Sequence, residues 1–198
     1  MTETEANRRC PMCGTSTAEA YCPDDGVETV QLSSFARDAL SYEPGDSISG
    51  RYRITGTLGR GGFGAVYSAE HTSTLQPVAV KVLTVDPNSI DEDAVKRFYK
   101  EAQITARLTH PNTVRVFDVG QAEQGPLFLV MELLRGPTLD QILKRLAKKR
   151  RTMTEMQTIE VCIPILRALG EAHEAGLVHR DMKPTNVMLT QVSGDEPI

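Results

Sequence analysis

The chain has 198 residues, of which 40% are hydrophobic and 24% charged, with 15 Gly and 11 Pro. This composition is typical of globular proteins and excludes the collagen-like, disordered and disulfide-scaffold classes. The net charge of −4 gives no electrostatic reason to expect nucleic acid as a partner. Residues 1–50 hold 3 basic and 9 acidic side chains, against 19 and 17 in residues 51–198, so we expect a boundary near residue 50.

No run of residues approaches the roughly 20 apolar positions that span a bilayer. The first nine residues, M-T-E-T-E-A-N-R-R, lack the apolar core of a secretory signal. We therefore expect a cytoplasmic chain with no membrane segment of its own. Three of the four cysteines fall between residues 10 and 22, which is unlike a disulfide framework and favours metal binding.

Residues 1–27 predict a small metal-binding module. Cys10 and Cys13 have the spacing at which two thiolates from one tight turn reach a single tetrahedral ion, and a second turn over residues 22–26 repeats this geometry from Cys22. Asp25 stands where a fourth cysteine would be expected, and its carboxylate can ligate zinc. We expect one structural Zn²⁺ held by these four residues, because so short a segment cannot build a core without such a staple. The alternative is a flexible tail with free thiols.

The rest of the chain predicts a linker, then a sheet, then helices. Residues 28–50 mix weak helical spacing with Pro and Gly, which indicates a linker with one helical turn. Five β-type runs predict an antiparallel sheet over residues 51–58, 65–70, 78–83, 114–119 and 127–133. Helical spacing predicts helices over residues 91–108, 139–147 and about 155–175, with capping boxes at Ser89-Glu92 and Thr154-Gln157 and a stop at His110-Pro111.

The segment 59–66, G-R-G-G-F-G-A-V, matches G-x-G-x-x-G-x-V. A dinucleotide-binding turn shares this glycine spacing, but it requires a helix after the last glycine. Here A-V-Y-S-A-E alternates like a strand, so the glycines lie in a hairpin, where missing side chains let backbone amides close over phosphates. No G-x-x-x-x-G-K-[ST] occurs, which excludes a P-loop.

Lys81 ends a strand-like run of buried-type residues, V-A-V-K. Such a lysine is usually an edge charge reaching water. Glu101, however, shares a helical face with Phe98, Ala102, Thr105 and Leu108, and a carboxylate on a core-facing side requires a cation. We therefore predict that Lys81 and Glu101 pair.

Residues 179–186, H-R-D-M-K-P-T-N, match H-R-D-x-K-P-x-N. Together with the glycine hairpin, the lysine strand and the helix glutamate in this order, they make residues 51–189 resemble a eukaryotic-type serine/threonine protein kinase. The resemblance implies an α+β fold, with a kinase N-lobe of five antiparallel strands and one helix over residues 51–134 and the first helical part of the C-lobe over residues 135–198. The cysteine segment resembles the zinc-ribbon-like elements that precede some bacterial serine/threonine kinases.

The resemblance also implies roles for individual residues. Asp181 would accept the proton of a Ser or Thr hydroxyl on a protein substrate, Lys183 would stabilise the moving phosphoryl group, and Asn186 would hold Mg²⁺. Lys81, oriented by Glu101, would contact the α- and β-phosphates of ATP. The remaining ATP contacts would come from the glycine hairpin, the adenine-binding side chains and the hinge: Leu58, Gly59, Gly61, Gly62, Phe63, Gly64, Val66, Ala79, Met131, Glu132, Leu134 and Met188.

The sequence ends before any D-F-G, so we expect this chain to be a truncated kinase that is inactive by itself. The alternative is a non-catalytic ATP-binding or regulatory module of the pseudokinase kind. Two further features have plain interpretations. The basic run over residues 144–151 is expected to be a solvated helix end, and Cys162 a core residue in an apolar stripe rather than a reactive thiol.

Overall fold

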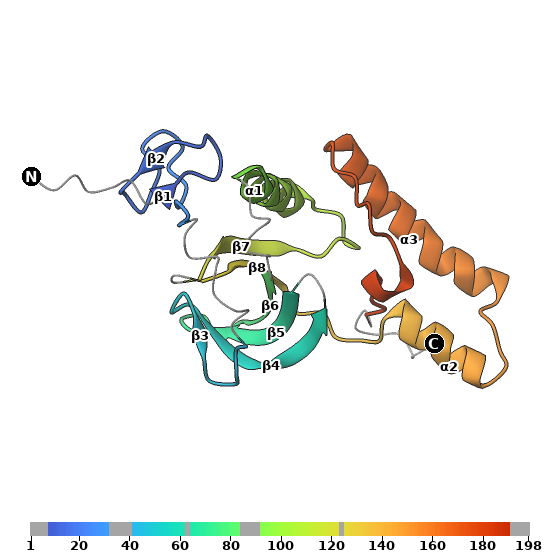
Figure 1. Cartoon of the computed structure of the whole chain (residues 1–198). Coiled ribbons are helices and arrows are strands. Elements are labelled where there is room, and N and C mark those ends of the chain that lie inside the picture. The colour runs from blue at the N-terminus through green and yellow to red at the C-terminus, as the bar shows by residue number, and fades with distance from the viewer. Residues whose placement is uncertain (1–7, 32–40, 62–63, 84–91, 123–124, 191–198) are drawn as a thin grey trace, which may run out of the picture. The chain divides into compact units, whose positions relative to one another are not determined.

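The computed structural model describes residues 8–31, 41–61, 64–83, 92–122 and 125–190, and it divides into two compact units (Figure 1). The N-terminal unit comprises residues 1–107 and 115–132, and the C-terminal unit comprises residues 108–114 and 133–198. The predicted capping box at Ser89 and the glycine-loop residues Gly62 and Phe63 lie outside the described residues.

A six-stranded antiparallel sheet forms the body of the N-terminal unit, in the order β3-β4-β5-β6-β8-β7. Five of these strands match the predicted ones in order and place. The strands are β3 (Ser47–Ile48), β4 (Tyr52–Gly61), β5 (Gly64–His71), β6 (Pro77–Leu83), β7 (Val116–Gln121) and β8 (Leu127–Glu132). The additional strand β3 comes from residues that the sequence assigned to a linker, and it pairs Ile48 with Tyr52 of β4.

One face of this sheet carries the larger apolar core. Val78, Val80 and Val82 alternate along β6 and are at most 6% exposed, because successive strand residues point to opposite faces. Phe128 and Val130 of β8 join them in one cluster. The cluster also contains Tyr42 and Ile48, so part of the expected linker belongs to the core.

Helix α1 (Glu92–Arg107) packs against the sheet beside β7, in the second apolar cluster. Val95 and Tyr99, one turn apart on α1, are buried with Leu127 of β8 and with Val30 from the N-terminal segment. The helix ends three residues before the predicted stop at His110-Pro111. Its strong amphipathic pattern, V-x-x-F-Y-x-x-A from Val95 to Ala102, explains why this stretch forms a helix whose apolar face is covered.

The N-terminal module, residues 8–30, forms two loops closed by short strands β1 (Arg8–Arg9) and β2 (Ser16–Thr17). Backbone pairs between Arg9 and Val30 and between Tyr21 and Glu28 complete it. The module thus extends to Val30, three residues beyond the boundary expected from the sequence. In Figure 1 it lies beside α1.

The described part of the C-terminal unit contains two helices and a short 3₁₀ turn: α2 (Leu139–Lys148), α3 (Glu155–Glu174) and η2 (Pro184–Asn186). The predicted capping box is confirmed, since Thr154 accepts a hydrogen bond from the Gln157 backbone and Gln157 accepts one from Thr154. Among the described residues, no helix combines the length and apolar character needed to cross a membrane.

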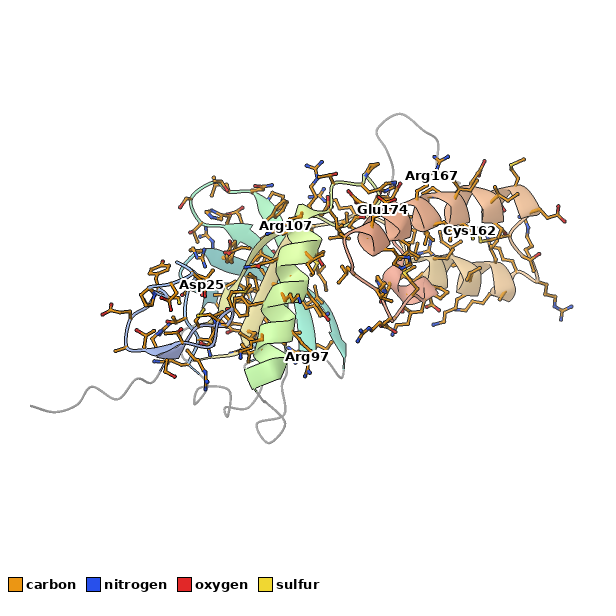
Figure 2. The ribbon with its side chains drawn as sticks, turned by 90° about the horizontal axis from the view of Figure 1, so that it is seen from above. Asp25, Arg97, Arg107, Cys162, Arg167 and Glu174 are labelled. Atoms are coloured by element: carbon orange, nitrogen blue, oxygen red, sulfur yellow. The ribbon has the colours of Figure 1, made fainter. Side chains whose placement is uncertain are left out.

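Cys162 is exposed, which corrects the prediction that it is a core residue (Figure 2). The apolar stripe on α3 exists as the spacing predicts, but Ala172, which lies outside this stripe, is the one buried residue of the helix. Ile159 and Leu166 are 50% and 66% exposed. Periodicity reveals which face of a helix is apolar, but it cannot show whether another element of the described chain packs against that face.

Candidate functional site

The loop after α3 brings three predicted catalytic side chains together. Lys183 Nζ lies 2.8 Å from Asp181 Oδ2, and Asn186 Nδ2 donates to the same carboxylate oxygen at 3.1 Å and to the Asp181 carbonyl at 2.8 Å. The Lys183 ammonium and the Asn186 amide lower the pKa of Asp181. The exposed carboxylate is therefore ionised and available as a proton acceptor.

The backbone of this loop explains how its side chains converge. Arg180 adopts a φ of 59°, a left-handed conformation that is costly for a residue with a side chain. The Asp181 amide donates to the His179 carbonyl at 2.8 Å, which closes a tight turn. The 3₁₀ turn η2 then returns Asn186 towards Asp181. Together these two contacts hold Asp181 beside Asn186.

A second group of predicted residues shares one face of the sheet. Val66 pairs with Lys81 across β5 and β6, and Ala79 pairs with Met131 across β6 and β8. Because paired residues point to the same face, these four side chains lie opposite the Val78–Val82 core. Lys81 is half-buried there, beside the small and apolar side chains predicted to contact adenine.

The glycine hairpin joins β4 to β5, as predicted from the alternation after Gly64. Gly59 pairs with Val66, and Gly61 pairs with Gly64. Gly64 has a φ of +130°, and a Cβ there would overlap the Val82 carbonyl oxygen, so only glycine fits. Gly59 and Gly61 have open space around them, which leaves their backbone accessible to a ligand. Leu58, expected to cover adenine, is 54% exposed.

Glu101 does not lie where the helical face predicted it. It is exposed on α1, and in the described part of the chain it forms no ion pair with Lys81. The apolar face of α1 is instead centred on Val95, Tyr99 and Ala102, which places position 101 beside that face rather than within it. The pairing of Lys81 with Glu101 stays a prediction.

The remaining predicted ATP contacts divide between the units. Glu132 ends β8 in the N-terminal unit, where its carboxylate accepts the Arg115 amide at 2.7 Å. Leu134 and Met188 belong to the C-terminal unit and are half-buried. Met188 forms a backbone bridge with Thr138, so the segment after the catalytic loop runs beside the segment before α2.

Two structural residues in this unit escaped the sequence reasoning. Gly136 has a φ of +145°, and a Cβ there would overlap the Leu189 carbonyl oxygen, so it permits close contact between these two segments. Glu171 of α3 accepts the backbone amides of Thr109 and His110 at 2.9 and 3.0 Å, and these bonds lower its pKa. In the sequence, the one available signal for either residue was the glycine at position 136, shortly after the end of β8.

The N-terminal module gathers all four predicted zinc ligands. The Sγ atoms of Cys10, Cys13 and Cys22 and a carboxylate oxygen of Asp25 lie within 4.8 Å of one another. Cys13 Sγ and Cys22 Sγ are 3.7 Å apart, which matches the roughly 3.8 Å between sulfurs bound tetrahedrally at about 2.3 Å from zinc. Figure 2 shows Asp25 among the loops of this module.

The two loops share a backbone design that the sequence spacing indicated. The Gly14 amide donates to the Cys10 carbonyl at 3.1 Å, and the Gly26 amide donates to the Cys22 carbonyl at 2.9 Å. Both glycines have positive φ, 84° and 68°. Backbone amides also donate to Cys10 Sγ, from Met12 at 3.3 Å. Such amide-to-sulfur bonds stabilise a thiolate, as a metal ligand requires.

Burial and neighbouring groups shift the ionisation of the residues in this cluster. Burial raises the pKa of the Cys10 thiol to about 12, so in the absence of a cation it stays protonated near neutral pH. The neighbouring thiols of Cys13 and Cys10 lower the pKa of Asp25. A divalent ion bound here would replace the thiol protons, so its binding would depend on pH.

Comparison with known proteins agrees with the geometry. Residues 52–195 match the family model described as protein kinase domain. The chain is 41% identical over 145 residues to serine/threonine-protein kinase pkn3 of Myxococcus xanthus, an alignment covering 73% of this chain and 26% of that protein. It is 37% identical over 155 residues to PknA of Mycobacterium tuberculosis, covering 76% of this chain and 35% of that kinase.

Among solved structures, the kinase domain of Mycobacterium tuberculosis PknI superposes with a TM-score of 0.67 at 29% identity, covering 76% of this chain and 59% of that one. The chain thus spans about a quarter to a third of the curated relatives and somewhat more than half of a solved kinase domain. On the family match, the sequence identities and the shared fold, this chain belongs to the protein kinase family.

Proposed function

We propose that this chain carries the ATP-binding and catalytic-loop portion of a kinase that transfers the γ-phosphoryl group of ATP to Ser or Thr hydroxyls of proteins. The arrangement of Asp181, Lys183 and Asn186 carries the proposal. It unites an ionised carboxylate, a cation and an amide within hydrogen-bonding distance on an exposed loop. Phosphoryl transfer depends mainly on positioning and on neutralising charge, and this trio serves both purposes.

Each member of the trio has a distinct chemical task in this proposal. Asp181 accepts the proton of the attacking hydroxyl as its oxygen bonds to the γ-phosphorus and the bond to the β-phosphate oxygen breaks. Lys183 stabilises the negative charge on the moving phosphoryl group. The Asn186 amide nitrogen already donates to Asp181, so its carbonyl oxygen is left for Mg²⁺, a hard cation that prefers oxygen ligands. Bound Mg²⁺ would neutralise charge on the phosphates.

The shared sheet face supports ATP binding by the N-terminal unit. Val66, Ala79 and Met131 offer an apolar surface for a flat base, and Lys81 provides a cation on the same face. The open surroundings of Gly59 and Gly61 allow backbone amides to approach phosphates. The lysine of β6 and the aspartate of the catalytic loop come from different units, so transfer requires both.

A phosphoryl-transfer assay on a longer chain that contains a complete kinase domain tests this proposal. With γ-labelled ATP and a Ser/Thr-rich protein substrate, Asp181→Asn and Lys81→Met should each reduce turnover by about a thousandfold or more, with unchanged thermal unfolding. Lys148→Met, an exposed lysine of α2, is the matched control and should retain activity. Turnover that survives Asp181→Asn would refute the assignment. ATP binding without turnover in the unsubstituted chain would favour the non-catalytic alternative.

We further propose that Cys10, Cys13, Cys22 and Asp25 hold one structural Zn²⁺. Support comes from the close approach of four ligand atoms of the right chemistry and from the sulfur separation expected for a tetrahedral site. Metal analysis of the purified chain should find close to one equivalent of zinc. Cys13→Ser should lose it, Asp25→Ala should weaken binding less because water can replace a carboxylate, and Cys162→Ser should have no effect. A metal-free wild-type chain would refute the site.

A further inference from the structure

The N-terminal module and the sheet together cover the apolar face of helix α1. Val30 is 1% exposed and is buried with Val95 and Tyr99 of α1 and Leu127 of β8. Among the described side chains of α1, Val95, Tyr99 and Ala102 are the buried ones, so two of these three depend on a cluster that includes Val30. Figure 1 shows the module directly beside the helix. Loss of this contact would remove part of the cover over the face that holds α1 against the sheet.

The loop that carries the metal ligands is itself part of this contact. Met12 lies between Cys10 and Cys13, donates its amide to Cys10 Sγ at 3.3 Å, and packs against the same apolar cluster. A change in the geometry of the Cys10–Cys13 loop therefore moves a side chain that contacts α1. Few other apolar groups stabilise the module internally, so its order depends on its ligands and on this contact.

Electrostatics connect the same two elements. Three thiolates and one carboxylate around a divalent ion leave a net negative centre. Lys96, half-buried on α1, places its Nζ so close to the Cys10–Gly14 loop that a Cβ built on Gly14 would lie 3.1 Å away. Arg9 Nε donates to the Gly14 carbonyl of the same loop at 2.9 Å. A cation of α1 thus lies beside the loop that begins at Cys10, and metal binding would make the centre in that loop negative.

The base of the module is anchored separately to the sheet. Gln121 of edge strand β7 accepts the Gln31 amide at 2.8 Å and donates to the Gln31 carbonyl at 2.9 Å. Through this pair of bonds, the Gln31 backbone is attached to the edge of the sheet much as an additional strand would be. The module therefore contacts both β7 and α1. Because it is anchored to β7, it can restrict movement of the helix relative to the sheet.

From these contacts we propose that metal binding by the N-terminal module fixes the position of α1, so that zinc occupancy controls the helix that carries Glu101. The proposal rests on the zinc site proposed above. Without the ion, the loops lose their internal cross-link, and Met12 and Val30 no longer form a rigid surface for Val95 and Tyr99. The pairing of Glu101 with Lys81 would then respond to metal supply.

Hydrogen exchange of the full chain, measured with zinc bound and after chelation, tests this coupling. Zinc should slow exchange of α1 amides from Val95 to Arg107 by about tenfold or more, which is the effect expected from keeping one large apolar side chain buried. Amides of β4 and β5 are the internal control, since their core belongs to the other cluster and should not respond. Zinc stoichiometry is measured on the same samples.

Val30→Ala separates the coupling from metal binding. This variant keeps all four ligands, so it should still bind one zinc, but most of the zinc-dependent protection of α1 should disappear. One bound zinc with no change in α1 exchange in the wild-type chain would overturn the coupling and leave the zinc site intact. Absence of bound zinc would overturn both.

A second measurement addresses the electrostatic contact. Lys96→Met should weaken zinc binding several-fold in competition with a chromophoric chelator, because the negative centre loses a neighbouring cation. Lys148→Met removes the same charge from α2 in the other unit and is the matched control. Equal zinc affinities for the two variants would contradict a contact between α1 and the metal-bearing loop.

Discussion

Gly64 shows how one residue limits the geometry of the glycine hairpin between β4 and β5. Its φ of +130° and the Val82 carbonyl beside it leave no room for a side chain. Gly64→Ala should therefore lower the free energy of unfolding by about 1–3 kcal/mol, the usual range for a strained backbone conformation. Urea unfolding followed by circular dichroism measures the change.

Gly61→Ala provides the matched control for this prediction. Gly61 lies in the same hairpin and pairs with Gly64, but it has no positive φ in the left-handed range, and a Cβ added to it would meet nothing within 4 Å. The substitution should leave stability nearly unchanged. If both alanine variants unfold at the same urea concentration, the close approach of Gly64 to β6 does not persist in solution.

Asp181 titrates under the control of its two neighbours. Its pKa is lowered first by Lys183 and then by Asn186. A carboxyl whose pKa is depressed by folding stabilises the folded chain above its unfolded pKa, and this contribution disappears as the pH falls through the folded pKa. Lys183→Met should therefore raise the pKa of Asp181 towards its ordinary value, as measured by NMR titration of the carboxyl carbon. An unchanged pKa would show that the 2.8 Å ion pair does not persist in solution.

At the scale of elements, local patterns predicted most of the fold. Alternation located five strands, and the Thr154-Gln157 pair located the start of α3 to the residue. The failures occur where a tertiary contact decides the outcome. Strand β3 is two residues long and exists because Ile48 fits the core beside Tyr52. Its sequence carries no periodicity, so no local signal could reveal it.

In the candidate sites, too, local sequence predicted some features, whereas tertiary contacts decided others. The clustering of Cys10, Cys13, Cys22 and Asp25, and that of the loop residues Asp181 to Asn186, was predictable because each set is close in sequence and constrained by a short motif. The docking of Val30 on α1 was not predictable, since it joins residues 65 positions or more apart and depends on how an amphipathic helix is turned. The exposure of Glu101 has the same cause, because helical spacing assigns a face only to within one residue.

Tyr99 offers a test of how α1 is packed. Its ring is 4% exposed in the cluster with Val30, but its hydroxyl has no hydrogen-bond partner among the described residues. A buried, unpaired hydroxyl costs free energy, so Tyr99→Phe should leave the urea midpoint unchanged or raise it. Tyr99→Ala should lower stability by about 3–5 kcal/mol, the usual loss for a large aromatic side chain. A large loss in Tyr99→Phe would mean that the hydroxyl is bonded after all.

At the scale of the molecule, the residues proposed for phosphoryl transfer are divided between two units. Lys81 and the glycine hairpin belong to the N-terminal unit, and Asp181 to Asn186 belong to the C-terminal unit. The 198-residue chain aligns with 59% of a solved kinase domain. Since D-F-G is absent from it, we expect no transfer by this chain alone, and Asp181-dependent turnover by the 198 residues would prove that wrong.

Helix α3 leads to the last prediction, about association of the whole chain. Met156, Ile159, Ile163 and Leu166 follow one face of α3 and are 64%, 50%, 43% and 66% exposed. Contiguous apolar faces of this kind bind other apolar surfaces. The 198-residue chain should therefore bind the dye ANS and self-associate at roughly 10–100 µM, the range in which exposed apolar surface becomes aggregation-prone.

Replacing two residues of that face identifies it as the cause. Ile159→Gln combined with Leu166→Gln should lower dye fluorescence and shift sedimentation towards the monomer, because the polar amides interrupt the apolar face. Leu75→Gln is the matched control, since Leu75 is also exposed, at 61%, but lies in a turn away from any apolar cluster. A wild-type chain that stays monomeric and binds no dye would show that the α3 face is covered in solution.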